Sequence, residues 1–422
     1  MIVLYYMFLA VNIFLASLLI YFEAKRNSPF LLLWLSLIAI YFIPSSFDYN
    51  LYYIQPHSLS VVLTIDHKTL LISQIFAFAV MFFYLLFMYM FVLVFGFSRY
   101  EITMVNDQKI YLALIWVFLY IAIFSLVIIY FKFGVEYFTT YNFVEAREEI
   151  PFYLKVGSVY TQLLAVGLGF YYARKKRHRM IVVLFGLFLI FFLLIGGSRQ
   201  PLVLFMISAF MGFVLTNNYS FKHVAMLILV AQPILYFLQL LLALRNTTGF
   251  IERVDLFSLV MFGQEGIDAS REETLRFAYY YFISQYGNVD IFQSFSYLFR
   301  TLMFWIPTSL SYGIKPADFE YEMFSVYMPG FQGTLHPTLF GTIFADTGWY
   351  FVIWSLYFSL ISFFMPYVFN KLGFALKSSL FGLLCYCAIM YSRGAFYGAT
   401  VILFYSVLVL YIYNVYFSKR GV

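Results

Sequence analysis

Long apolar runs recur along the whole of this chain, and they limit its fold more than any other feature does. A helix needs about 20 apolar residues to cross the hydrocarbon core of a bilayer, whereas membrane β-strands are about half as long. The eleven runs therefore predict an all-α fold, a polytopic transmembrane helical bundle of about 11 spans or more. They cover residues 2–22, 29–47, 69–97, 110–131, 154–172, 180–196, 200–216, 223–244, 346–369, 379–391 and 395–417.

The composition excludes a soluble protein. Hydrophobic residues make up 64% of the 422 residues, charged residues make up only 11%, and the mean hydropathy is +0.86. Soluble domains carry about 25% charged residues. The net charge of +6 does not indicate nucleic acid as a partner, because an excess of Lys and Arg in a membrane protein marks its cytoplasmic loops.

The basic residues follow a pattern that predicts the topology. Each odd-numbered run is followed by Lys or Arg, and acidic residues gather after even-numbered runs. The positive-inside rule then places the N-terminus outside and the C-terminus inside the membrane. The basic residues in this pattern are Lys25, Arg26, Arg99, Lys109, Arg174, Lys175, Lys176, Arg177, Arg179, Lys222, Lys371, Lys377, Lys419 and Arg420.

One long interval is too polar to cross a membrane. Residues 245–345 separate spans 1–8, in residues 1–244, from spans 9–11, in residues 346–422. As far as His336 the interval carries six Arg/Lys and ten Asp/Glu, which is too few charges for disorder and too many for the hydrocarbon core. We therefore expect a large extracytoplasmic loop that folds as a lid over a membrane-embedded active site.

Two amphipathic helices are expected inside the long loop. The Ser270-Arg271-Glu272-Glu273 sequence fits a capping box, which predicts a helix ending at Gly287-Asn288. A second helix is expected over 289–305, ending before Pro307. Both are amphipathic enough to lie on the membrane surface or to pack on the bundle. The Pro- and Gly-rich residues 307–337 predict an irregular segment.

A short polar break separates two of the runs, with the sequence Gly196-Gly197-Ser198-Arg199-Gln200-Pro201. A membrane-embedded arginine costs at least about 2.5–3.5 kcal/mol on insertion scales unless it meets water or an anion. Pro201 suits the first turn of the next helix, whose N-terminal amides would lie beside Arg199 at the outer face. These amides, the helix dipole and a guanidinium predict an anion site. The alternative is a tight turn whose arginine reaches lipid headgroups.

Arg245 and Arg393 occupy similar positions at the outer face of the predicted topology. Positive charge is disfavoured on that side, so an anionic ligand is the simplest explanation for both residues. Pyrophosphate suits them, because arginine binds phosphate oxygens in a bidentate manner. The alternative is that each arginine contacts headgroups separately.

His336 is the candidate general base, because histidine exchanges protons near neutral pH. It precedes span nine at the outer face, and a structural role is the alternative. Glu252, Asp255, Asp346 and the acids of residues 145–149 are further candidates. The sequence has no P-loop, no HExxH or CxxC spacing and no Asp-x-Asp pair beside the arginines. We therefore expect neither a metal nor another cofactor.

Three segments resemble motifs of one known family. They are GGSRQPLVLFMIS at 196–208, IPTSLSYGIKPADF at 306–319 and LHPTLFGTIFADTGWYFVIW at 335–354. These segments, together with the topology, resemble oligosaccharide repeat-unit polymerases, the Wzy family of O-antigen and capsule assembly. The related O-antigen ligases share this architecture.

The resemblance implies a metal-independent glycosyltransferase of the bacterial cytoplasmic (inner) membrane. Such an enzyme would join undecaprenyl-diphosphate-linked oligosaccharide repeat units into O-antigen, capsule or a related surface polysaccharide at the outer face. Arg199, Arg245 and Arg393, with Ser198, would bind the diphosphate; Arg199 and Arg245 would also stabilise it as it leaves, and His336 would be the catalytic base. The implied partners are lipid-linked glycans, membrane lipids and a polysaccharide chain-length regulator.

Two other functions stay open. An O-antigen ligase would transfer the glycan to a lipid A-core acceptor. A transporter or flippase of lipid-linked or anionic solutes is the alternative from another class. Transporters tend to have short loops and paired repeats with broken helices, and the sequence shows neither feature.

Overall fold

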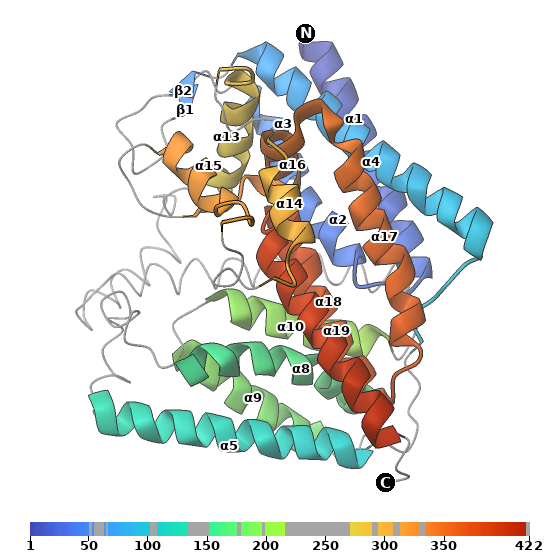
Figure 1. The fold of residues 1–422 in the computed structure, drawn as a ribbon, viewed down its shortest axis with the longest axis vertical. Helices are drawn as coiled ribbons and strands as arrows, with labels where there is room; N and C mark the ends of the chain where they lie inside the picture. Colours follow the sequence, from blue (N-terminus) through green and yellow to red (C-terminus); the bar gives the residue numbers. More distant parts are fainter. Residues whose placement is uncertain are drawn as a thin grey trace. The chain divides into compact units, whose positions relative to one another are not determined.

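The computed structural model describes residues 1–49, 53–54, 63–64, 66–101, 108–133, 152–174, 179–195, 199–215, 271–288, 294–306, 313–328 and 334–418. Regular structure in these residues is helical, apart from a two-residue antiparallel ladder between β1 (Tyr53–Ile54) and β2 (Leu63–Thr64). Figure 1 shows the helices, which are α1 (Ile2–Lys25), α2 (Leu31–Leu37), η1 (Ile38–Phe42), α3 (Ile43–Asp48), α4 (His67–Phe95), α5 (Gln108–Phe133), α8 (Phe152–Arg174), α9 (Arg179–Ile195), α10 (Arg199–Leu215), α13 (Arg271–Ser284), α14 (Ser296–Leu302), α15 (Phe319–Tyr327), α16 (Thr338–Thr347), η4 (Gly348–Tyr350), α17 (Val352–Phe369), α18 (Phe374–Arg393) and α19 (Phe396–Ser418).

The predicted apolar runs form helices wherever the structure describes them, and the run at 223–244 lies outside the described residues. Five of the described helical segments are long and apolar enough to cross a membrane, namely α1, the continuous α2–η1–α3, α4, α17 and α18. Shorter apolar helices cover Ile115–Ile128, Arg179–Ile190, Leu202–Leu215 and Phe396–Ile412. The chain is therefore a helical protein with the properties of a multi-pass membrane protein.

The second predicted span contains a π-helical turn, η1, between α2 and α3. Pro44 follows this turn in the first positions of α3. Proline has no N–H to donate, and its ring displaces the carbonyl four residues earlier. The widened turn at η1 accommodates both effects without ending the helix.

The chain divides into two compact units, each of which is described here by itself. Unit 1 comprises Met1–Glu101, Ala269–Lys371 and Cys387–Val422, and unit 2 comprises Ile102–Asp268 and Leu372–Tyr386. Each unit therefore combines distant parts of the chain. The linear division into spans 1–8, loop and spans 9–11 stays a prediction.

The first helices of unit 1 alternate in direction, as predicted (Figure 1). At one end of the unit the backbone N–H of Tyr100 donates to the carbonyl of Arg26 at 2.9 Å. At the other end the Tyr5 hydroxyl donates to the carbonyl of Ser45 at 2.6 Å. The predicted connections at Arg26 and Tyr100 therefore meet at one end, and the outer ends of the first two predicted spans meet at the other; the compartment that each end faces stays a prediction.

The first predicted helix of the long loop is α13, and it packs into unit 1 rather than lying on a membrane surface. Its predicted cap, Ser270, lies outside the described residues. The Arg276 guanidinium donates to both carboxylate oxygens of Asp48, at 2.5 and 2.9 Å, and the Tyr280 hydroxyl donates to one of them at 2.7 Å. This buried ion pair fixes α13 against the end of α3.

The second predicted loop helix is shorter than expected. The range 289–305 was predicted, whereas the helix in the described residues is α14, which begins at Ser296. The Asp346 carboxylate accepts hydrogen bonds from the N–H groups of Tyr297 and Leu298, at 2.9 and 3.1 Å. A carboxylate from a distant segment therefore caps the first turn of α14 and sets where it starts.

The prediction of an irregular segment at 307–337 is wrong at α15. Asp318 precedes this helix and accepts a hydrogen bond from the N–H of Glu320 at 3.2 Å. Acidic residues in the first turn add to this cap. Span nine was predicted to begin at Asp346, but α16 ends just after that residue, and α17 begins at Val352 after the turn η4.

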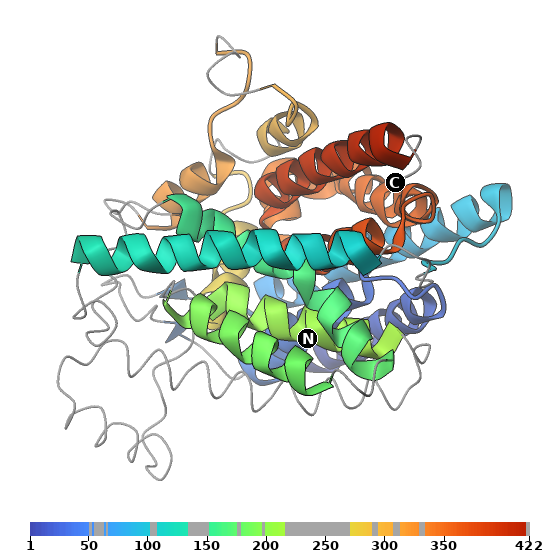
Figure 2. The same cartoon turned by 90° about the horizontal axis from the view of Figure 1, so that it is seen from below.

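Unit 2 contains α5, α8, α9, α10 and the first part of α18. In both views α5 runs alongside α8 (Figures 1 and 2). The backbones of α8 and α10 approach so closely that a Cβ on Gly212 would overlap the carbonyl of Val166, and a Cβ on Gly169 would overlap that of Ala209. Small residues permit this contact, which is typical of membrane helix pairs.

Candidate functional site

Four segments of unit 1 converge near the end of the long loop. They are α14, α15, the residues leading into α16, and the turn between α18 and α19. Gly394 makes this turn with a φ of +96°, and a Cβ there would overlap Thr338 and Thr342 of α16. The Thr342 hydroxyl donates to the Gly394 carbonyl at 3.2 Å. Glycine thus lets Arg393 approach the residues before α16.

His336 lies in this convergence, in the segment that leads into α16. Its side chain is 23% exposed, while its Nδ1 atom is fully buried and makes no hydrogen bond among the described residues. Burial, and then the positive charge of Arg393, lower the pKa of His336 from 6.5 to about 4. The imidazole is therefore neutral at neutral pH.

Glu320 of α15 faces His336, with its Oε2 atom 3.7 Å from Nδ1. This distance is too long for a hydrogen bond. Because the imidazole is neutral, the contact is not an ion pair either. Burial raises the pKa of Glu320 from 4.5 to about 7, against a lowering effect of its hydrogen bond with Tyr297. Its carboxyl group therefore changes protonation near neutral pH.

Tyr297 of α14 holds Glu320 in place. The Tyr297 hydroxyl donates to Glu320 Oε1 at 2.5 Å. The Tyr297 hydroxyl oxygen accepts hydrogen bonds from the backbone N–H groups of Phe396 and Tyr397, at 2.9 and 3.0 Å. The first amides of α19 are thus linked through Tyr297 to Glu320, and Glu320 faces His336.

We call His336, Glu320, Tyr297 and Arg393 the His336 cluster. It combines a neutral imidazole, a carboxyl with a pKa near 7 and a guanidinium whose charge acts on the imidazole. Perturbed pKa values of this kind gather at functional sites. In acyl-transfer enzymes an imidazole paired with a carboxylate takes a proton from a hydroxyl group; here the imidazole and the carboxyl group face each other without a hydrogen bond.

Of the predicted site residues, His336 and Arg393 come together, with Ser392 of the same helix end fully buried. Arg199 begins α10 in unit 2, with Pro201 in the first turn as predicted. Ser198 and Arg245 lie outside the described residues. A common site for Arg199, Arg245 and His336 therefore stays a prediction.

Asp346, another predicted candidate base, is fully buried at the end of α16. Besides the two α14 amides, its carboxylate accepts the Trp354 indole N–H at 2.9 Å. All three donors support the charged form, although burial raises the pKa to about 6. A carboxylate occupied in this way positions α14 and α17 and is not accessible to a substrate. The candidates Glu252, Asp255 and 145–149 lie outside the described residues.

Sequence reasoning missed Glu320 and Tyr297. A signal for Glu320 was present, since Asp318 followed by Glu320 and Glu322 is a typical helix start. Tyr297 carried no such signal, because its partners at 396 and 397 are distant in sequence. Within the part of the chain that the structure describes, no group of three or more His, Cys, Asp or Glu residues is arranged to hold a metal ion.

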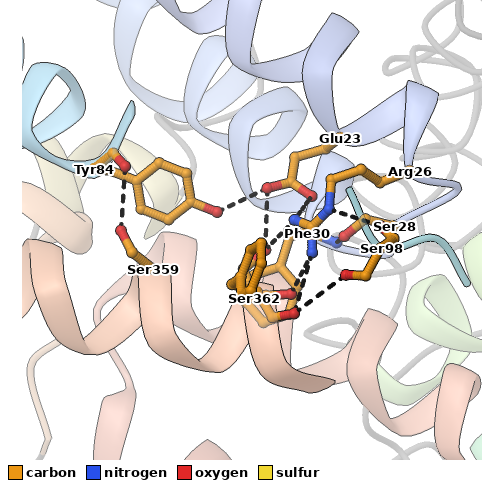
Figure 3. Close-up of polar contacts among 9 residues, drawn as sticks. Glu23, Arg26, Ser28, Phe30, Tyr84, Ser98, Ser359 and Ser362 are labelled. Carbon is orange, nitrogen blue, oxygen red and sulfur yellow. Dashed lines mark hydrogen bonds and ion pairs between the residues drawn. The ribbon is translucent and has the colours of Figure 1, made fainter. Parts of the chain in front are cut away.

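A second polar cluster lies at the C-terminal end of α1, and Figure 3 shows its contacts. Glu23 and Arg26 are fully buried and form an ion pair at 3.2 Å. Ser362 of α17 bonds to both, since its hydroxyl donates to Glu23 Oε1 at 3.0 Å and accepts from Arg26 Nη1 at 3.1 Å. Tyr84 donates to Glu23 at 2.8 Å, and the Ser98 carbonyl accepts from Arg26 Nε at 3.3 Å. We call these five residues the Arg26 cluster.

Comparison of the chain with protein-family models, with curated proteins and with solved structures finds no match in any of the three. The geometry of the His336 cluster is therefore the structural basis for a functional proposal.

Proposed function

We propose that the chain is the polymerase that its sequence resembles. It joins undecaprenyl-diphosphate-linked oligosaccharide repeat units into O-antigen, capsule or a related polysaccharide, without a metal, at the outer face of a bacterial cytoplasmic membrane. The observation that supports this proposal most is the neutral imidazole of His336 between Glu320 and Arg393.

The cluster suits proton removal from a sugar hydroxyl. His336 Nε2 accepts the proton as the hydroxyl oxygen of one lipid-linked repeat unit attacks the anomeric carbon of the glycan on another lipid. The new carbon–oxygen bond forms while the bond to the diphosphate breaks, and undecaprenyl diphosphate leaves with the electron pair. The Glu320 carboxylate faces Nδ1 and stabilises the imidazolium that forms.

The leaving diphosphate requires positive charge. Arg393 supplies a guanidinium close enough to His336 to lower its pKa, and Arg199, Arg245 and Ser198 are proposed to complete the anion site. Guanidinium groups aimed at developing negative charge are an electrostatic form of catalysis. The long loop excludes water, because hydrolysis is the competing reaction.

The decisive experiment is reconstitution of the purified protein with the undecaprenyl-diphosphate-linked repeat unit of its own host. A ladder of products spaced by one repeat unit is the expected result. Products of one transfer that form only when lipid A-core is added would indicate a ligase instead. Translocation of the lipid-linked glycan without a new glycosidic bond would indicate a flippase.

The assignment of the site needs a matched substitution. His336→Gln should remove the ladder, whereas His178→Gln, in the basic segment predicted to be cytoplasmic, should leave it intact. A His336→Gln protein that produces the ladder at the wild-type rate would overturn the site while leaving the function open.

A further inference from the structure

The segment that contains α14 lies parallel to the first turns of α19. Tyr297 accepts the N–H groups of Phe396 and Tyr397, while further along the ring centroids of Phe304 and Phe404 are 4.2 Å apart. Figures 1 and 2 both show α14 beside the N-terminal part of α19. The two segments therefore remain side by side from the start of α19 to its third turn.

Two buried cations fix this segment to α19. The Arg300 guanidinium and the Lys315 ammonium lie over the ring of Tyr397, at 4.6 and 4.7 Å from its centroid. Lys315 Nζ also donates to the Tyr397 hydroxyl at 2.6 Å and to the carbonyl of Ile306 at 2.8 Å. From Ser296 to Ile306 the chain thus runs in the same direction as α19, away from the N-terminal end of that helix. At Lys315 it is beside Tyr397 again, near the start of α19.

The outer face of this segment is apolar. Phe299, Leu302 and Trp305 are 51%, 49% and 60% exposed. Phe299 and Leu302 are three residues apart on one side of α14, and Trp305 follows in the turn after it. Arg300, the charged residue of α14, and Thr301 are buried on the other side, and Ser296 at the start of the helix is partly exposed. An exposed face of this kind is unusual in water and marks a contact with an apolar partner.

Several backbone groups of the turn after α14 have hydrogen-bond partners within the protein. The carbonyl of Trp305 accepts a hydrogen bond from the Tyr405 hydroxyl at 3.4 Å. The carbonyl of Ile306 accepts a hydrogen bond from the Lys315 ammonium. The N–H of Ile306 donates to the carbonyl of Met303 at 3.1 Å. Irregular backbone is tolerated at membrane depth only where its polar groups find such partners.

We propose that residues 296–306 insert into the membrane as part of a re-entrant element that is again beside Tyr397 at Lys315, with Phe299, Leu302 and Trp305 immersed in the fatty acyl chains of the outer leaflet. We infer lipid as the partner of this face because it continues onto α19. The exposed side of α19 beside Trp305 carries Tyr405, Leu408 and Val409. Tyr405 comes nine residues after Phe396, which at 1.5 Å per residue is about 13 Å along the helix. That depth lies well inside a bilayer whose hydrocarbon core is about 30 Å thick.

This inference goes beyond the proposed glycosyl transfer and does not rest on it. It places part of the predicted extracytoplasmic loop within the leaflet. The His336 cluster then lies directly behind the inserted segment, because Tyr297 belongs to both. If the proposed function holds, a lipid-linked substrate would approach the cluster from the side, within the membrane.

Tryptophan fluorescence in vesicles of phosphatidylcholine, with and without brominated acyl chains, tests the proposal. Trp305→Phe should cause a loss of the lipid-quenched signal and leave quenching by aqueous iodide unchanged. Trp116, which is 63% exposed on the apolar α5, is the positive control, and Trp116→Phe should cause a similar loss. Trp34 is only 1% exposed, so Trp34→Phe should leave the lipid-quenched signal unchanged.

Two other results would overturn the proposal. If Trp305→Phe reduces iodide quenching instead, the segment lies in water. If it changes neither signal, another protein surface, such as a second copy of this chain, covers the aromatic face.

A cysteine series provides a second test in a chain that keeps every tryptophan. Phe299→Cys and Leu302→Cys should resist a membrane-impermeant maleimide, whereas Ser294→Cys, at an exposed polar residue before α14, should be modified rapidly. The two native cysteines, Cys385 and Cys387, are buried. Equal modification of all three new cysteines would place α14 outside the membrane.

Discussion

The Arg26 cluster and the His336 cluster are both buried groups of charged and hydrogen-bonding side chains in unit 1, yet they differ in completeness. Every guanidinium nitrogen of Arg26 has a partner, and both carboxylate oxygens of Glu23 are occupied. In the His336 cluster, Nδ1 of the imidazole has no hydrogen bond among the described residues. A complete network stabilises a fold, whereas an incomplete one beside shifted pKa values is typical of a site that acts on a substrate.

Arg26 has a structural role in addition to the topological one predicted from the sequence. Arg26 belongs to the basic residues that predict a cytoplasmic connection, and such residues normally lie in water. In the structure Arg26 is fully buried, whereas Lys25 beside it is exposed. Arg26 therefore stabilises the fold, while its exposed neighbour Lys25 has the surroundings expected of a residue in a cytoplasmic connection.

The largest expected effect is on catalysis. His336→Gln should lower the initial rate of glycan transfer by about 10²- to 10⁴-fold, the usual contribution of a general base. The melting temperature should not fall, because Nδ1 of His336 makes no hydrogen bond that the substitution would break. Rates and melting curves of the same purified sample separate the two effects. A rate loss that merely follows a loss of folded protein would contradict the catalytic assignment.

The Arg26 cluster should show the opposite behaviour. Arg26→Met leaves Glu23 charged and buried without its partner, which costs about 3–5 kcal/mol of unfolding free energy. Denaturant unfolding in detergent micelles measures this change. Lys25→Met is the matched control at an exposed residue and should change the stability by less than about 0.5 kcal/mol. Equal stabilities of the two variants would show that the Arg26 cluster is not a structural element.

The pH dependence should distinguish the clusters further. The folded-state pKa of Glu320 is raised from 4.5 to about 7, so its stabilising effect is fully present below pH 4.5 and is lost as the pH rises through 7. The rate should rise over the same interval, because the carboxylate that stabilises the imidazolium forms there. Glu320→Gln should remove both trends. If Glu320 had no part in catalysis or stability, the wild-type protein and Glu320→Gln would show the same rate–pH and melting–pH profiles.

His336 adds a trend on the acid side. Its pKa is lowered from 6.5 to about 4, so the unfolded chain binds the proton more readily than the folded one does. The free energy of unfolding is therefore unaffected by this group above pH 6.5 and decreases as the pH falls from 6.5 toward 4. His336→Gln should therefore flatten the acid limb of the melting–pH profile. An unchanged acid limb would mean that the imidazole is not held neutral.

The smallest expected effect is at the edge of the Arg26 cluster. The Ser359 hydroxyl donates to the carbonyl of Ser355 in its own helix at 2.7 Å. Ser359→Ala should cost about 0.5–1.5 kcal/mol of unfolding free energy, the net value of one hydrogen bond, because no charge loses its partner. A loss as large as that of Arg26→Met would show that the hydroxyl supports the ion pair.

Much of the helical structure was predictable. The apolar runs locate the described membrane helices to within a few residues, because the length of a membrane helix and its apolar surface are local properties. The end of α13 near Gly287 and the place of Pro201 in the first turn of α10 follow from backbone chemistry at single residues. The errors at α14, α15 and α16 arose where capping groups decide the boundary, and Asp346 caps α14 from about fifty residues away.

The sequence alone was sufficient for the helical fold with apolar, membrane-length helices, and it named His336 and Arg393 as candidate site residues, because apolar length and residue chemistry are local properties of the sequence. Which of the charged residues are neutralised, and by which partners, depended on contacts across the folded chain. Arg26 with Ser362, Asp48 with Arg276, and Tyr297 with the start of α19 are pairs far apart in sequence. Burial and hydrogen bonding at such pairs set the energy of each charge, and neither exists before the helices pack.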